Sequence, residues 1–109
     1  MINWARITEL REEIGAEDFE EVVELFLSEV EERLETVSAD KSFEDFEEDM
    51  HFLKGSALNL GFEELARLCS DGESRAASKD AISDIASIFA AYEKSKQIFL
   101  SKLSGEQAA

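Results

Sequence analysis

The chain has one histidine, His51, which begins the stretch HFLKGSALNLGFEEL of residues 51–65. A lysine follows three residues later, at Lys54, and a glycine four residues later, at Gly55. A neutral imidazole is a nucleophile near neutral pH, because the reference pKa of histidine is about 6.5. An ammonium group one helical turn away offsets negative charge on a group attached to the ring. These residue types at this spacing suit transfer of a phosphoryl group to and from nitrogen.

The apolar residues around His51 place the imidazole on the outside of a helix. From Phe43 to Leu60 they recur at three- and four-residue spacing, which predicts an amphipathic helix closed by Gly61. At ~100° per residue, His51 points roughly 130° away from the centre of this apolar stripe. A buried, structural histidine is therefore not expected, and the alternative to a reactive imidazole is a solvated surface residue without a role.

Gly55 favours the reactive imidazole over the inert one. A glycine inside a helix costs about 1 kcal/mol relative to alanine, and nothing in the surrounding pattern ends the helix at this position. The missing side chain leaves room beside His51 on the same helix face, along which a bulky partner can approach.

Four further segments carry the helical period, over residues 4–14, 17–38, 62–76 and from Asp80 to about residue 103. No segment alternates with period two, and connections of two to five residues imply antiparallel neighbours. We therefore predict an all-α fold, an antiparallel up-down four-helix bundle with a short additional N-terminal helix. Residues 1–103 are expected to form a single helical domain, and SGEQAA at 104–109 a frayed C-terminal tail.

The apolar stripes define the expected core, and capping residues define three of the expected helix ends. Gly15 follows the first helix where a helix would stop, and Ser42-x-x-Asp45 resembles a capping box before the third. Asp80 is the expected cap of the fifth. The remaining stripe residues are Ile7, Leu10 and Ile14; Phe19, Val23, Phe26, Val30, Leu34 and Val37; Phe62, Leu65, Leu68, Cys69 and Ala76; and Ile82, Ile85, Phe89, Tyr92, Phe99 and Leu103.

The charge of the chain excludes several classes of partner. With 11 basic against 26 acidic residues, the formal net charge is -15. This field repels the phosphates of nucleic acids and the surface of anionic membranes, so neither is an expected partner. The single cysteine cannot form an internal disulfide, and no apolar run approaches the ~18 residues of a membrane span. We expect a soluble, cytoplasmic protein.

Other possible sites are weaker. The glutamates of residues 20–35 could suggest a carboxylate-bridged metal centre, but that chemistry needs inward Glu-x-x-His pairs, and these side chains face mostly outward. Cys69 is predicted to fill the core. No glycine-rich phosphate loop with a preceding strand is present, so the chain has no evident ATP site, which separates a phosphate carrier from a kinase. We expect neither a metal nor a cofactor.

The stretch HFLKGSALNLGFEEL resembles the signature of histidine-containing phosphotransfer (HPt) domains, His-x-x-Lys-Gly-Ser/Ala with a second glycine ten residues after the histidine. ELREEIGAEDFEEVVELFLSEV and LARLCSDGESRAA are similar to the preceding and following helices of that family. The resemblance implies that His51 is phosphorylated on the ring nitrogen farther from the backbone and that Lys54 neutralises the phosphoryl group. It further implies that Gly55 admits the incoming domain and that Ser56 lends polar support. One departure is Gly72, where relatives commonly carry an aliphatic residue; a small void or a close helix contact is expected there.

HPt domains are carriers in two-component phosphorelays, so the resemblance implies that the partners are response-regulator receiver domains and a hybrid sensor histidine kinase. It places Mg²⁺ in the receiver domain only. Because this acidic chain cannot attract acidic receivers at long range, we expect local apolar contact near His51, with Leu58 the best candidate. Five amphipathic segments can close a core within one chain, which predicts a monomer. The alternatives are a non-catalytic helical interaction module and the dimerising, phosphoaccepting part of a histidine kinase.

Overall fold

The computed structural model describes residues 2–38, 40–80 and 85–108, with side chains described as far as residue 102. Five helices form: α1 (Trp4–Ile14), α2 (Phe19–Thr36), α3 (Phe43–Leu60), α4 (Glu63–Ala77) and α5 (Ile85–Ala108). Within the described ranges no strand forms, and a single β-bridge joins Ile2 to Phe62. The predicted all-α class is confirmed.

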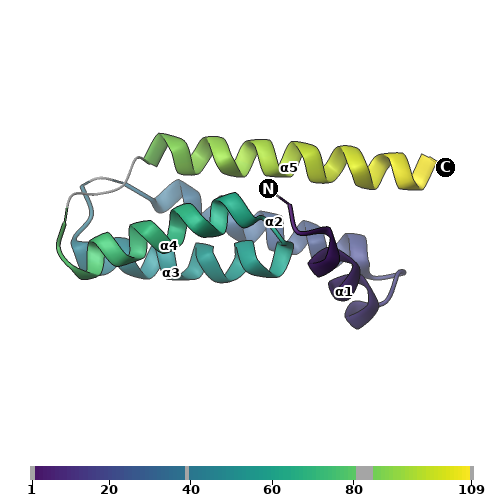
Figure 1. Ribbon diagram of the computed structural model, residues 1–109, viewed down its shortest axis with the longest axis horizontal. Helices are drawn as coiled ribbons and strands as arrows, with labels where there is room; N and C mark the ends of the chain where they lie inside the picture. Colours follow the sequence, from purple (N-terminus) through teal and green to yellow (C-terminus); the bar gives the residue numbers. More distant parts are fainter. Residues whose placement is uncertain (1, 39, 81–84, 109) are drawn as a thin grey trace.

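Helices α2 to α5 run along the long axis of a body of 48 × 22 × 22 Å and alternate in direction (Figure 1). Helix α1 lies at one end, where it contacts α2 and α3, while α3 packs most extensively on α4. This is the predicted up-down bundle with a short N-terminal helix. No helix in the described ranges combines the length and hydropathy of a membrane-spanning segment.

Local capping explains where the helix that carries His51 begins and ends. The Ser42 hydroxyl accepts a hydrogen bond from the Asp45 N–H at 3.1 Å, as the capping pattern predicts. Gly61 ends α3 with φ 72°, a left-handed conformation that favours glycine. A Cβ at this position would lie 2.7 Å from the carbonyl oxygen of Asn3, so only glycine admits the N-terminal segment here. Both ends of α3 are thus set by the predicted residues.

The core follows the predicted stripes with clear exceptions on α2 and α5. On α2, Leu27 is buried and the predicted Phe26 only partly buried. On α5 the buried residue is Ile88, whereas Phe89 is 37% exposed. Ile88, Tyr92, Ser95 and Phe99 are spaced by three or four residues and share one face, and Phe89 lies about 100° round from it. Because α5 has apolar residues on several sides, its sequence pattern does not determine which face turns toward the core. The largest fully buried side chains are Tyr92, Phe46, Phe62, Phe99, Met50, Leu53, Leu60, Leu65, Ile88, Val23, Val30 and Cys69.

Some predictions about the last helix stay untested or fall outside the described part. Helix α5 continues to Ala108, so the backbone of residues 104–108 is helical, and the fraying of residues 104–109 stays a prediction. Glu106, Gln107 and Ala108 are good helix formers, and no proline interrupts them. The Asp80 backbone N–H donates to the Arg75 carbonyl at 2.8 Å. Residues 81–84 lie outside the described part, so the cap of α5 by Asp80 stays a prediction. Ile82 and the side chain of Leu103 lie outside the described part.

A buried ion cluster fixes α3 against α2. The Asp49 carboxylate is 2% exposed and pairs with Arg33 of α2 at 3.2 Å and with Lys41 of the connecting segment at 2.5 Å. The Arg33 guanidinium also lies over the Phe52 ring, 4.3 Å from its centroid. Asp49 and Phe52 flank His51 in sequence, so this cluster contributes to the orientation of the helix that presents the imidazole.

Candidate functional site around His51

His51 lies in the middle of α3 on the face opposite the core. Its side chain is 71% exposed, whereas its sequence neighbour Met50 and Leu53 are fully buried. Met50 and Leu53 pack α3 onto the bundle. The imidazole therefore projects into solvent from a helix that is held in place. This is the exposure that the periodicity of the sequence predicts.

The next helical turn brings the other predicted residues beside the ring. Lys54 is half-buried, with its side chain 29% exposed. Gly55 lies on the surface, and a Cβ placed there meets nothing within 4 Å, so the approach to His51 along the helix is open. Ser56 is half-buried, and its hydroxyl forms no hydrogen bond with a residue in the described part of the chain. Its polar support of the site stays a prediction.

Glu73 of α4 completes the site, and the sequence analysis did not identify it. One carboxylate oxygen lies 2.7 Å from His51 Nδ1, and the other accepts from Lys54 Nζ at 2.5 Å. The hydrogen bond from Lys54 lowers the pKa of Glu73 against the opposing effect of burial, and the bond to His51 lowers it further. An ionised carboxylate only accepts hydrogen bonds, so Nδ1 carries a proton. In the neutral ring the lone pair is therefore on Nε2, the nitrogen that points away from Glu73.

A signal for Glu73 is present in the sequence once the α3–α4 hairpin is recognised. His51 precedes and Glu73 follows the turn at Gly61 by similar numbers of residues, so antiparallel packing puts them at the same level of the bundle. Gly72 is buried on the core side of α4, and Glu73 stands one residue further round, toward α3. Which acidic residue of α4 meets the ring depends on the rotation of that helix.

Comparisons with known proteins agree with this geometry. The profile of the Hpt domain family matches residues 21–98. The chain belongs to the Hpt domain family. It is therefore a histidine phosphotransfer carrier of phosphorelays. Phosphorelay protein LuxU from Vibrio vulnificus strain YJ016 is 31% identical over 101 residues, covering 89% of this chain and 87% of the relative, and LuxU from strain CMCP6 has the same values. No solved structure gives a significant match.

Next to the imidazole, this Hpt domain has a shallow apolar depression between α3 and α4. Its volume is about 310 Å³, and Leu58 and Ala66 supply its apolar surface. Leu58 is 57% exposed, the highest exposure among the large apolar side chains described, together with Leu25. Lys54 connects the depression to the His51 site, and Arg67 borders it on α4. The predicted docking residue is thus exposed and lies two turns from His51 on the same face of α3.

The remaining candidate residues of this Hpt domain are structural or solvated. Cys69 is fully buried, and burial raises the pKa of its thiol to about 12, so it fills the core as predicted. Tyr92 is also buried, whereas Trp4 lies at the core edge and stacks on Phe99 with ring centroids 6.3 Å apart. In the described ranges no group of three or more His, Cys, Asp or Glu side chains is arranged to hold a metal ion.

Proposed function

We propose that His51 is the phosphoacceptor of this carrier and that Nε2 is the atom that bonds to phosphorus. The observation that carries this proposal is the Glu73 carboxylate on Nδ1, at 2.7 Å, because it directs the lone pair of the neutral ring to the solvent-facing nitrogen. His51 is the only histidine of the chain, and its side chain is exposed. These features support a reactive imidazole over an inert interaction surface.

In the forward step, the Nε2 lone pair of His51 attacks the phosphorus of an aspartyl phosphate on a receiver domain. The N–P bond forms as the bond between phosphorus and the aspartate oxygen breaks, and the aspartate carboxylate leaves with the electron pair. No proton has to move, since Nδ1 keeps its hydrogen and the ring becomes positively charged. The Glu73 carboxylate, in contact with Nδ1, stabilises that charge. Transfer to a second receiver is the reverse reaction.

Lys54 supplies the cation for the transferred group. Its ammonium is held by Glu73 at 2.5 Å, one turn from the ring, which keeps it ready to turn toward a phosphoryl group on Nε2. Glu73 thus bridges the nucleophile and the cation. Gly55 leaves the surface open so that the receiver active site can reach the ring.

We infer that the immediate partners are receiver domains of response regulators and of a hybrid sensor histidine kinase. The two matched relatives are named as phosphorelay proteins, which supports this assignment. The exposed depression around Leu58 is the contact surface that we assign to the receiver. The receiver brings the Mg²⁺, and this chain acts as a cytoplasmic monomer that takes its phosphate from protein rather than from ATP.

The test is a label-transfer experiment with a phosphorylated receiver domain and Mg²⁺. The wild-type chain should acquire a label that is lost in acid and retained in base, as expected for a phosphoramidate. His51→Gln should acquire none, and Lys54→Ala should acquire it more slowly while remaining folded. Acid-labile label on His51→Gln would refute the assignment of His51. Labelling of the isolated wild-type chain by ATP would refute its status as a carrier without kinase activity.

A further inference from the structure

A depression of about 240 Å³ lies between α2 and α5, the two helices of the bundle that the phosphotransfer site does not use. Leu34 of α2 and Tyr92 of α5 line it and are buried, so its floor is apolar. Phe89 also lines it and is 37% exposed. The apolar stripe of α5 assigns this ring to the core, and the structure leaves it at the surface of the α2–α5 depression.

The charged side chains around this apolar floor are mostly acidic. Glu31 and Glu35 of α2 and Glu93 of α5 contribute three carboxylates, against the one ammonium of Lys96. Lys96 pairs with Glu31 at 2.6 Å. The side chains of Glu35 and Glu93 form no ion pair or hydrogen bond within the described part of the chain. One carboxylate on each of the two helices is therefore available to a partner.

The acidic character of the α2–α5 depression does not depend on the residues outside the described ranges. All 11 lysines and arginines of the chain lie inside those ranges. The remaining residues therefore add no basic side chain to this surface, and the excess of carboxylates over ammonium groups in the lining stands.

Volume and charge restrict what can bind in the α2–α5 depression. Its volume is below the range of small-molecule sites, about 300–1,000 Å³, so it is suited to side chains presented by another protein. The carboxylates repel an acidic protein, which includes a second copy of this chain with its net charge of -15. A basic partner with an apolar contact residue matches both the charge and the exposed Phe89.

We propose that the α2–α5 depression binds a basic segment of a partner protein, in which arginine or lysine residues stand next to an apolar side chain. The basic groups pair with Glu35 and Glu93, and the apolar side chain packs on Phe89 and removes the ring from water. Tyr92 donates to Glu31 at 2.5 Å, so this part of the surface is already ordered before the partner binds.

The position of the α2–α5 depression leaves the phosphotransfer site accessible. His51 and Glu73 belong to α3 and α4, and α5 lies across the bundle from α3 (Figure 1). The two sites have no residue in common. A protein bound at the α2–α5 depression can therefore stay attached while a receiver domain binds at His51, which would anchor the carrier beside a basic partner.

The test titrates the full chain by calorimetry with an acetylated, amidated peptide of alternating arginine and leucine. We expect saturable binding with a dissociation constant below about 100 μM at low salt, and an affinity that falls as ionic strength rises. A peptide with serine in place of leucine keeps the charge and cannot cover Phe89, so it should bind at least about tenfold more weakly. A peptide with glutamate in place of arginine should not bind.

Matched pairs of substitutions separate this site from the general negative charge of the chain. Glu35→Gln combined with Glu93→Gln should weaken binding of the arginine–leucine peptide at least about tenfold. Glu12→Gln combined with Glu29→Gln changes the net charge equally, on exposed residues of α1 and α2 outside the depression, and should weaken binding by less than about twofold. All four side chains are exposed, so both variants should keep the helical circular dichroism of the wild type.

The apolar contact has its own matched control and a map that needs no variant. Phe89→Ser should weaken peptide binding, whereas Ile98→Ser, which removes an apolar side chain of 38% exposure from the same helix, should not. In the wild-type chain, the backbone amide NMR signals of Phe89 and Glu93 should shift as the peptide is added. Those of His51 and Gly55 should stay in place.

Several results would overturn the proposal. Absence of saturable binding up to about 1 mM peptide would do so, as would equal binding of the serine peptide or equal weakening by the two glutamine pairs. Amide shifts centred on His51 would place the peptide on the receiver surface. Self-association of the chain alone, abolished by Phe89→Ser, would assign the α2–α5 depression to a second copy. His51→Gln should bind the peptide as the wild type does, so none of these outcomes depends on whether His51 accepts phosphate.

Discussion

At the scale of single residues, the direction of the His51 ring depends on Glu73. A solvated imidazole exchanges its proton between two nitrogens, and only one of them faces the partner. The carboxylate on Nδ1 selects one tautomer, and the same carboxylate holds the Lys54 ammonium. A single side chain from α4 therefore contacts both the proposed nucleophile, His51, and the proposed phosphoryl-binding cation, Lys54.

Replacing Glu73 tests this positioning role directly. Glu73→Ala should release the ring, so that the tautomer with the proton on Nε2 becomes more populated and phosphoryl uptake slows by about tenfold or more. Glu73→Gln should keep the proton on Nδ1, because the amide oxygen still accepts, and should slow transfer less. The ¹⁵N chemical shifts of the single imidazole measure the tautomer without interference from another histidine.

A matched control for Glu73 is Glu29→Gln, an exposed carboxylate of α2 with the same charge change. It should alter neither the ring tautomer nor the rate of uptake. If Glu73→Ala shows the wild-type tautomer, the positioning role is wrong even when transfer is slower.

Gly55 provides a steric prediction. Because a Cβ at this position meets nothing within 4 Å, Gly55→Ala should fold normally and raise the free energy of unfolding by up to about 1 kcal/mol. Gly55→Gln should be as well folded but should slow transfer from a phosphorylated receiver, since its side chain stands in the approach path. Urea unfolding and transfer rates measure the two effects separately. Wild-type transfer by Gly55→Gln would show that the open surface is not required.

At the scale of helices, a small cluster of polar contacts attaches α5 to α2. The Tyr92 hydroxyl donates to Glu31 at 2.5 Å, and Lys96 pairs with the same carboxylate oxygen at 2.6 Å. The hydrogen bond from Lys96 and then that from Tyr92 hold the pKa of Glu31 below its ordinary value of 4.5. Burial and the neighbouring carboxylate raise the pKa of Tyr92, so its hydroxyl keeps its proton and remains a donor. Contact between a buried ring and a half-exposed carboxylate thus connects helices far apart in sequence.

Tyr92→Phe should lower the free energy of unfolding by about 1 kcal/mol at pH 7, because the ring stays packed and only the hydrogen bond is lost. The folded pKa of Glu31 lies below its unfolded value, so its stabilisation is present above pH 4.5 and is lost as pH falls through the folded value. The free energies of unfolding of the wild type and of Tyr92→Phe should therefore differ less below pH 4.5 than at pH 7. Urea unfolding at pH 7 and at pH 3.5 measures it, and an unchanged difference would contradict the role of Glu31.

At the scale of the whole molecule, charge governs the encounter with partners. A chain of formal charge -15 has no long-range attraction for an acidic receiver domain. Association must depend on close contact, for which the exposed Leu58 and the Lys54 ammonium are the described candidates. A small contact of this kind also releases its partner quickly, as a relay requires.

This charge predicts an unusual dependence on salt. Transfer from a phosphorylated receiver, with Mg²⁺ held constant, should be unchanged or slightly faster as ionic strength rises, because salt screens net repulsion. Electrostatically steered encounters show the opposite trend. Leu58→Ser should slow transfer at every salt concentration, whereas Leu25→Ser, an equally exposed leucine on α2, should not. A steep fall in the wild-type rate with salt would indicate a concentrated basic contact instead.

The sequence alone was sufficient for the features that depend on local interactions. Helical periodicity predicted the helices and the outward direction of His51, because the face of a residue within a helix follows from its spacing. Ser42 and Gly61 predicted the ends of α3, because capping involves residues within one or two turns. The residues His51, Lys54 and Gly55 were found in this way, since they lie within two turns of one helix.

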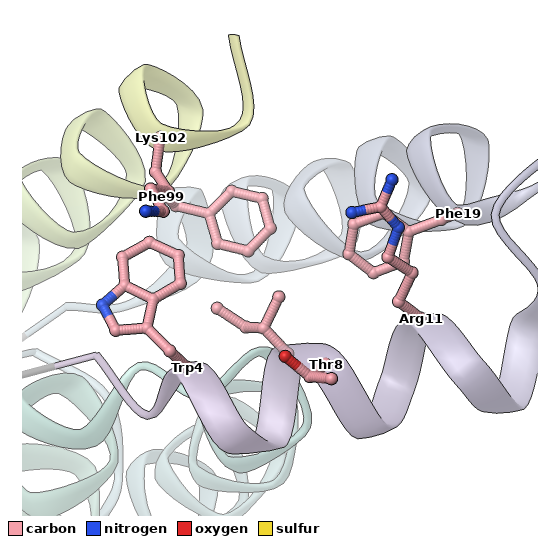
Figure 2. A pocket seen from close by; sticks show the side chains of 7 residues that line it. Trp4, Thr8, Arg11, Phe19, Phe99 and Lys102 are labelled. Atoms are coloured by element: carbon pink, nitrogen blue, oxygen red, sulfur yellow. The ribbon is translucent and has the colours of Figure 1, made fainter. Parts of the chain in front are cut away.

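The tertiary structure decided what depends on how helices rotate and pack against one another. Glu73 joins the site only through the α3–α4 hairpin, and one residue of rotation would bring a different side chain to the ring. The burial of Ile88 rather than Phe89 depends on the rotation of α5, a helix whose apolar residues occupy more than one face. The pocket lined by Trp4 and Phe99 forms only because α1 and α5, which are distant in sequence, meet in the fold (Figure 2). Such contacts leave no periodic signal along the chain, because their partners are set by packing rather than by spacing.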